Sequence, residues 1–154
     1  MSVSRYALKA PEAMCEAYDY PMPAAFSRGM AVELPGARLV FVSGTASVGP
    51  NGENLHVRDF RAQALRAFRN ARNVLRDAGA DWPHMVKATV YLKDIRQDYA
   101  AFNEVRRAYF SELGLSEYPA STCVEARLCR EELLVEMELT AVVPLELQKG
   151  AIGQ

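Results

Sequence analysis

The chain has 154 residues, a formal net charge of -1, and a composition that is 50% apolar and 24% charged. A chain of this length forms one domain with its own hydrophobic core, and the near-neutral charge argues against general nucleic-acid binding, which usually needs a basic excess. The longest apolar runs, such as residues 39–42, are too short to span a membrane, and the N-terminus lacks the pattern of a secretory signal.

The first 25 residues, 1–25, are predicted to be an appendage outside the main domain. Three prolines there interrupt regular structure, and three tyrosines indicate docking onto the domain rather than disorder. These residues are Pro11, Pro21, Pro23, Tyr6, Tyr18 and Tyr20. We expect the domain itself at residues 26–146 and a C-terminal tail at residues 147–154.

Two strands are predicted at the start of the domain, at residues 27–33 and 38–43, with a turn sequence between them at residues 34–37. Residues 49–52, Gly-Pro-Asn-Gly, indicate a second turn.

The clearest predicted helix covers residues 59–78, where apolar side chains fall on one face at 100° per residue. Asp59 suits the N-cap position and Gly79 the C′ position. Six arginines lie on the opposite face, which we interpret as a solvated surface rather than an RNA-binding one, because no aromatic side chains are interleaved with them. They are Arg58, Arg61, Arg66, Arg69, Arg72 and Arg76.

The remaining predicted elements are a strand at residues 85–92, a helix at residues 97–113, and strands at residues 121–128 and 133–143. The second helix is predicted to bury Tyr99, Phe102, Val105, Tyr109 and Leu113. This order predicts an α+β domain of two layers, with two helices on one face of a mixed sheet.

Candidate chemistry begins with polar side chains that alternate along the last two strands. In the final strand Glu136 and Glu138 point away from the core. Ser121, Cys123 and Glu125 alternate in the strand before it, so a polar set recurs on two successive strands. The sheet face is either solvated or lines a cleft at an interface.

Other polar residues leave alternatives open. Asn103 is expected at the edge of the buried stripe of the second helix. Its amide either forms hydrogen bonds that hold the helix to a loop or lines a cleft. His56 and His84 are interpreted as surface or capping residues, and Cys123 as a buried thiol rather than a nucleophile. No phosphate loop or dinucleotide motif is present.

The cysteines Cys15, Cys123 and Cys129 have no metal-ligand spacing. We therefore expect reduced thiols in a cytoplasmic protein, with no bound metal.

Six segments together resemble the Rid (reactive intermediate deaminase) family, also called the YjgF family, in order and in spacing. They are residues 26–29 (FSRG), 39–44 (LVFVSG), 86–94 (VKATVYLKD), 102–105 (FNEV), 119–125 (PASTCVE) and 134–138 (LVEME). The resemblance covers residues 24–144 and implies a chorismate-mutase-like fold, assembled as a homotrimer with three clefts between subunits.

The resemblance also implies an activity. Family members hydrolyse enamines and imines to ketoacids and ammonia without a cofactor or metal. An arginine pairs with the substrate carboxylate, and a glutamate on the last strand holds the attacking water. By position, Glu136 matches that glutamate, Ser43 and Gly44 the turn that orients the imine, Asn103 the helix asparagine, and Cys123 the strand cysteine.

Two positions depart from the family pattern. The arginine that follows Pro-Ala is Ser121 here, which would place the chain in a subgroup without the carboxylate-binding arginine, and a common tyrosine is Phe26. A serine supplies neither the charge nor the bidentate geometry of arginine. Either the substrate lacks a carboxylate there, or another cation such as Arg28 or Arg127 replaces the arginine, or the activity has been lost.

We therefore expect a cofactor-independent hydrolase acting on a small unsaturated metabolite, with a substrate changed from the family's amino-acid imines. Glu136 is the expected catalytic residue, and the other matched residues, with Phe26 and Arg28, are expected to line the substrate site. The alternatives are a trimer that binds small molecules or protects proteins without catalysis, and a ribonuclease. Membranes and nucleic acid are not expected partners.

Overall fold

Six strands form one sheet in the computed structural model, which describes residues 3–146; the tail predicted at residues 147–154 lies outside the described residues. The strands are β1 (Ser4–Leu8), β2 (Gly29–Leu34), β3 (Ala37–Ala46), β4 (Met85–Leu92), β5 (Ala120–Glu125) and β6 (Val135–Pro144). Their order in the sheet is β1-β2-β3-β6-β4-β5. Only β4 and β5 pair in parallel, which makes the sheet mixed, as predicted.

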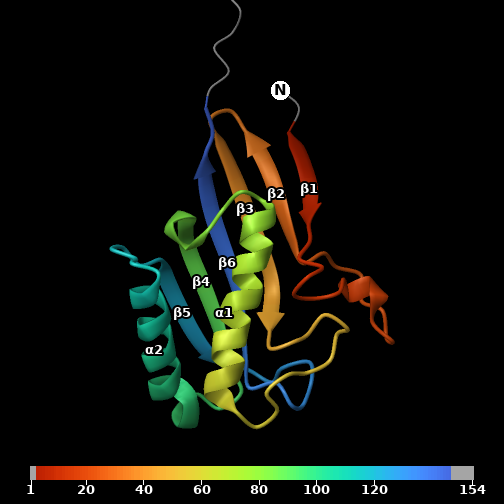
Figure 1. The fold of residues 1–154 in the computed structure, drawn as a ribbon, viewed down its shortest axis with the longest axis vertical. Coiled ribbons are helices and arrows are strands. Elements are labelled where there is room, and N and C mark those ends of the chain that lie inside the picture. The colour runs from red at the N-terminus through yellow and green to blue at the C-terminus, as the bar shows by residue number, and fades with distance from the viewer. Residues whose placement is uncertain (1–2, 147–154) are drawn as a thin grey trace, which may run out of the picture.

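Two helices, α1 (Phe60–Asp77) and α2 (Ile95–Glu112), cover the same face of this sheet (Figure 1). The helix α1 packs on β3 and β6, whereas α2 packs on α1 and on β4 near the edge of the sheet. The predicted α+β architecture with two layers is therefore confirmed. No helix in residues 3–146 has the length and apolar character needed to cross a membrane.

The alternation of side chains in β6 decides which face of the sheet is buried. Val135, Met137 and Leu139 are buried beneath the helices, while Glu138 is exposed and Glu136 half-buried on the other face. We call this other face, which no helix covers, the open face. The predicted orientation of both glutamates is confirmed.

The ends of α1 form as the sequence predicts. The Asp59 side chain accepts a hydrogen bond from the Ala62 backbone N–H (3.0 Å), and Gly79 has a φ of 69°, which suits a glycine after the helix.

Two buried polar residues of α1 hold the flanking loops to the helix. Asn70 donates to the Ala46 and Val48 carbonyls (both 2.9 Å), and Gln63 donates to the Glu132 carbonyl (2.9 Å).

The arginine face of α1 is mostly engaged within the protein. Arg72 and Arg76 both pair with Asp81, at 2.8 and 3.4 Å. Arg61 pairs with Glu104 on α2, and Arg66 donates to the Ala13 carbonyl (3.1 Å). The Arg61 and Arg76 side chains are 57% and 55% exposed, so these two arginines of the face are solvated, as interpreted, while they pair within the protein.

The helix α2 begins two residues earlier than predicted, because the Asp94 side chain accepts a hydrogen bond from the Gln97 backbone N–H (3.0 Å). The prediction that Tyr99 is buried is wrong, since 49% of its surface is exposed. The helix lies near the edge of the sheet and covers it with Phe102, Tyr109 and Phe110.

The strand β1 was not predicted. Residues 4–8 pair antiparallel with β2 and extend the edge of the sheet, and the three prolines lie beyond this strand. Only Leu8 of the five residues is buried, so no apolar alternation indicated a strand. Its pairing depends on backbone hydrogen bonds, which the side chains do not encode.

Candidate functional site

A β-bulge in β3 shapes the backbone on the open face. The pairing with β6 shifts between Val42 and Thr45, so that Ser43 and Gly44 together lie opposite Glu138. Gly44 lies directly against Glu136, because a Cβ atom added to it would stand 2.0 Å from the Glu136 Oε1 atom. Glycine is therefore required here for the carboxylate to lie against the backbone.

Glu136 borders a cavity of about 640 Å³. Burial raises the pKa of its carboxyl group above the ordinary value, and the nearby Glu138 carboxylate raises it further. Both causes favour the protonated form of the carboxyl group. The other walls come from β3, from the N-terminal segment and from the loop before β6, through Tyr20, Phe26, Arg28, Gly44, Arg130 and Leu133 among others.

Arg28 is 3% exposed and holds the N-terminal segment in this wall. Its Nε and Nη2 atoms donate to the Cys15 carbonyl (2.9 and 2.5 Å), and Nη2 also donates to the Tyr20 hydroxyl. Its guanidinium lies 5.1 Å from the centroid of the Tyr20 ring and 5.8 Å from that of Phe26. Arg28 is thus engaged near Glu136 and does not approach Ser121.

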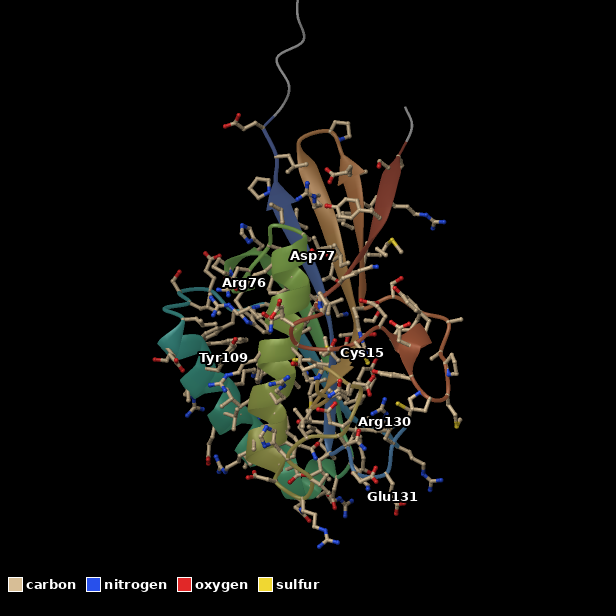
Figure 2. The ribbon with its side chains drawn as sticks, turned by 45° about the vertical axis from the view of Figure 1, so that its right-hand side comes forward. Cys15, Arg76, Asp77, Tyr109, Arg130 and Glu131 are labelled. Atoms are coloured by element: carbon tan, nitrogen blue, oxygen red, sulfur yellow. The ribbon has the colours of Figure 1, made fainter. Side chains whose placement is uncertain are left out.

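A second cation contacts the same tyrosine. The Arg130 guanidinium lies 4.6 Å from the centroid of the Tyr20 ring, and its Nη1 donates to the Gly52 carbonyl (2.5 Å). Figure 2 labels Arg130 and Cys15 on this side of the molecule. The Tyr20 ring therefore joins the N-terminal segment to the loop before β6, at the cavity that Glu136 borders.

Ser43 lies in a neighbouring hollow of the open face, not beside Glu136. Its hydroxyl donates to the Ser27 carbonyl (2.6 Å), and it borders a cavity of about 670 Å³ together with Phe26, Lys87 and Glu138. The bulge therefore separates two adjacent hollows, and Phe26 borders both.

Ser121 and Cys123 do not share a sheet face with Glu136, and the prediction of one common polar face is wrong. The parallel pairing of β5 with β4 places Ser121 beside Ala88 and Cys123 beside Val90, on the face that the helices cover. Alternation shows which residues of one strand share a face, but the pairing between strands decides which face that is. The candidate residues thus lie on opposite faces of the sheet within one chain.

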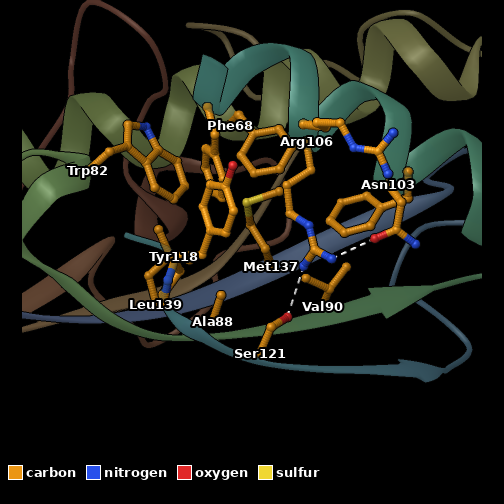
Figure 3. Close-up of a pocket in the computed structure, with 14 residues that line it drawn as sticks. Phe68, Trp82, Ala88, Val90, Asn103, Arg106, Tyr118, Ser121, Met137 and Leu139 are labelled. Atoms are coloured by element: carbon orange, nitrogen blue, oxygen red, sulfur yellow. Dashed lines mark hydrogen bonds between the residues drawn. The ribbon is translucent and has the colours of Figure 1, made fainter. Parts of the chain in front are cut away.

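The side chain that reaches Ser121 is Arg106, which was not predicted. Its Nη1 donates to the Ser121 hydroxyl (3.0 Å) and its Nη2 to the Asn103 Oδ1 atom (2.5 Å) (Figure 3). Asn103 in turn donates from Nδ2 to the Tyr99 carbonyl (2.9 Å), so the amide orients the guanidinium. The signal in the sequence was the spacing of three residues between Asn103 and Arg106, which puts both on one helix face.

A cavity of about 260 Å³ lies beside Arg106, between α2 and the sheet (Figure 3). Its walls are mostly apolar and aromatic. They include Trp82, Val90, Phe102, Phe110, Met137 and Leu139, with Asn103, Tyr118 and Ser121 also lining it. Arg127, proposed from the sequence as a replacement cation, is exposed and does not line this cavity.

The remaining candidates have ordinary structural roles. Burial raises the pKa of the half-buried Cys123 thiol, and the opposing effect of Arg106 does not overcome it, which disfavours a nucleophilic thiolate. The His84 Nδ1 atom accepts a hydrogen bond from the Asp81 backbone N–H (3.0 Å), which confirms a capping role. Within residues 3–146, no three His, Cys, Asp or Glu side chains are grouped as metal ligands.

Comparison with known proteins gives consistent matches. Residues 21–143 match the model of a family described as endoribonuclease L-PSP. A RutC family protein of Pyrococcus abyssi is 36% identical over 102 residues, which are 66% of this chain and 76% of that protein. The 3-aminoacrylate deaminase RutC of Acinetobacter baylyi is 31% identical over 105 residues, 68% of this chain and 79% of that protein. The crystal structure of the YjgF gene product of E. coli superposes with a TM-score of 0.71 at 28% identity, covering 89% of this chain and 98% of that one.

Proposed function

The chain belongs to the endoribonuclease L-PSP family, which includes RutC and YjgF proteins, and on this basis we propose that it is a cofactor-independent deaminase. It would hydrolyse the C=N bond of a small imine, or of an enamine through its imine form. Water adds to the carbon, nitrogen leaves as ammonia, and a carbonyl compound remains.

The observation that carries this proposal is the position of Glu136. Its half-buried carboxylate lies against the Gly44 backbone at the edge of a cavity, with a pKa raised by burial. A carboxylate with a raised pKa is a better proton acceptor, so Glu136 would take a proton from water as the oxygen attacks the carbon. It would then return the proton to the departing nitrogen. Holding the water beside the C=N carbon lowers the barrier further.

A second group would anchor the substrate. Arg106 lies beside Ser121, where the family resemblance places an arginine, and its guanidinium would hold a substrate carboxylate by two parallel hydrogen bonds. This geometry favours the second of the three outcomes expected for Ser121, in which another cation takes over. The proposed substrate therefore keeps a carboxylate.

The complete cleft would need two copies of the chain. Glu136 and Arg106 lie on opposite faces of the sheet in one chain, so a neighbouring copy would have to bring its α2–β5 edge to the open face. Exposed apolar side chains on that face, among them Phe26, Phe41 and Val124, support such a contact. We propose a homotrimer, the assembly that the family resemblance implies.

The test is the substitution Glu136→Gln, which keeps the shape and removes the charge. Ammonia release from the imine that the wild-type protein hydrolyses fastest should fall by about 10²- to 10⁴-fold. Circular dichroism and light scattering should show an unchanged fold and assembly. Full activity in this variant would remove the proposal.

A ribonuclease is the alternative, because the matched family is described as endoribonuclease L-PSP. Steep salt dependence of RNA binding, with cleavage that survives Glu136→Gln, would support it. The engagement of four α1 arginines in internal contacts disfavours it. Saturable binding of a small molecule without any turnover would instead indicate a binding protein without catalysis.

A further inference from the structure

Arg106 carries a charge that no carboxylate neutralises within the part of the chain that the structure describes. The ion pairs there involve Arg38, Arg61, Arg72 and Arg76. The partners of Arg106 are instead a hydroxyl and an amide oxygen, which are neutral. A guanidinium has five N–H donors, and the two hydrogen bonds use only two of them. The remaining donors and the full charge are available to an anion.

The guanidinium is also held in one orientation. Asn103 and Ser121 contact its two terminal nitrogens, and its central carbon lies 5.1 Å from the centroid of the Phe102 ring. An arginine ordered in this way loses little conformational entropy on binding a ligand, which is the condition for a tight bidentate contact. Ser121 itself is exposed, so this end of the cavity is open to solvent.

The cavity behind the guanidinium suits an apolar group. Its volume is about 260 Å³, and its floor consists of the buried side chains of Trp82, Met137 and Leu139. An apolar cavity of roughly 150 Å³ is large enough to hold a benzene ring. An aromatic ring or a branched alkyl group therefore fits, with room for the bond that joins it to an anionic group beside Arg106.

We propose that this cavity binds a small carboxylate attached to one compact apolar group, either an aromatic ring or a branched alkyl chain. Arg106 holds the carboxylate, and the apolar group lies against Trp82 and Phe110. Such a carboxylate would be the substrate of the deaminase proposed above, and this part of the proposal rests on that function. The binding of such a carboxylate does not depend on catalysis and can be measured separately.

Fluorescence provides a direct measurement, because Trp82 lines the cavity and is the only tryptophan of the chain. We would titrate the full-length protein with phenylacetate, with acetate and with the neutral phenylacetamide. Phenylacetate should change the emission saturably, and it should bind roughly 10- to 100-fold more tightly than phenylacetamide, because only the carboxylate forms a charge-assisted pair with arginine. Acetate, which lacks the apolar group, should bind at least about tenfold more weakly than phenylacetate.

Substitutions of Arg106 test whether its charge determines which ligand the cavity prefers. Arg106→Gln should abolish the preference for phenylacetate over phenylacetamide, and Arg106→Lys, which keeps the charge without the planar fork, should retain part of it. Arg96→Gln is the matched control, since it removes an exposed arginine from the same helix outside the cavity. It should leave the preference unchanged.

Three results would overturn the inference: equal affinity for phenylacetate and phenylacetamide, no saturable change with phenylacetate, or a preference that persists in Arg106→Gln. Turnover by Glu136→Gln, compared with ligand binding by the wild-type protein, shows whether the ligand class or the deaminase function is wrong. If Glu136→Gln loses turnover while the wild-type protein shows no preference, the ligand class is wrong and the deaminase stands. If phenylacetate binds through Arg106 but no imine is hydrolysed, the deaminase is wrong and the binding site stands.

Discussion

Glu136 is held by two local features, a bulge and a glycine. The bulge in β3 brings the Gly44 backbone to its carboxylate, and the missing Cβ of Gly44 leaves the necessary space. Burial then raises the pKa of the carboxyl group. At the scale of single residues, the position of the Glu136 carboxylate, and with it the proposed role, therefore depends on Gly44 having no side chain.

The raised pKa of Glu136 predicts opposite pH effects on activity and on stability. Activity needs the ionised form, so the acidic limb of kcat/KM should lie above pH 4.5, the ordinary value for this group. The folded state favours the protonated form, so this contribution to stability is present below pH 4.5 and is lost as the pH rises through the raised pKa. Glu136→Gln should therefore be more stable than the wild-type protein at pH 7, by roughly 0.5–2 kcal/mol. Thermal unfolding at pH 4 and pH 7 checks this, and a difference that does not grow with pH would contradict it.

Gly44→Ala is predicted to displace the Glu136 carboxylate. The new Cβ would lie 2.0 Å from Oε1, so either the carboxylate or the bulge must move. We expect a loss of about 1–3 kcal/mol in the free energy of unfolding, as for other overpacked sites, together with a large fall in kcat. Denaturant unfolding and steady-state kinetics measure both. The matched control is Gly114→Ala, at a position where a Cβ would meet nothing within 4 Å. It should lower stability through its positive φ while leaving kcat unchanged.

At the scale of elements, the segment between β1 and β2 forms a wall of the cavity at Glu136. Tyr20 connects this segment to Arg28 and Arg130, which each contact its ring. A cation–π contact contributes about 0.5–2 kcal/mol. Met14 and Ala17 also anchor the segment in the core, so Tyr20 is the contact that fixes its end next to the proposed reaction site.

Tyr20→Ala should loosen this segment and raise KM more than it lowers kcat, because the wall of the cavity is lost while Glu136 stays in place. Hydrogen exchange should become faster in residues 13–26, and the melting temperature should fall by roughly 2–6 °C. Tyr18→Ala, an exposed tyrosine in the same segment, is the control. Equal effects of the two substitutions would show that the Arg28 and Arg130 contacts are not responsible.

At the scale of the whole molecule, the two halves of the proposed cleft belong to opposite faces of one sheet. Glu136 borders a hollow at the open face, and Arg106 borders the cavity beneath α2. The sheet separates the two side chains within one chain. In the proposed trimer, a second copy of the chain would supply the missing half of the cleft.

Mixing two inactive variants tests this arrangement. Glu136→Gln and Arg106→Gln should each have low activity alone, and co-expression should restore it. In trimers that assemble at random, about a quarter of the clefts would receive an intact residue from each neighbour. Light scattering should show trimers throughout, and Phe41→Glu on the open face should yield folded monomers without activity. No recovery in the mixed trimers would show that Glu136 and Arg106 of neighbouring copies do not form a shared site.

Features that depend on neighbouring residues along the chain could be predicted without a structure. Alternation placed Glu136 and Glu138 on the face away from the helices, the helical period identified the buried face of α1, and Asp59 marked where that helix begins. The order of the predicted helices and strands indicated the two-layer fold. These features are local because the repeats of 2.0 and 3.6 residues are written in consecutive side chains.

The tertiary structure alone decided the pairing between distant segments. It added β1 to the sheet, set β5 beside β4 so that Ser121 faces the helices, and brought Arg106 to Ser121. Strands pair through backbone hydrogen bonds that nearly every residue can form, so the side chains of one strand do not show which distant strand it pairs with. The position of the proposed anchor therefore followed from packing across the molecule, whereas the orientation of Glu136 followed from its own strand.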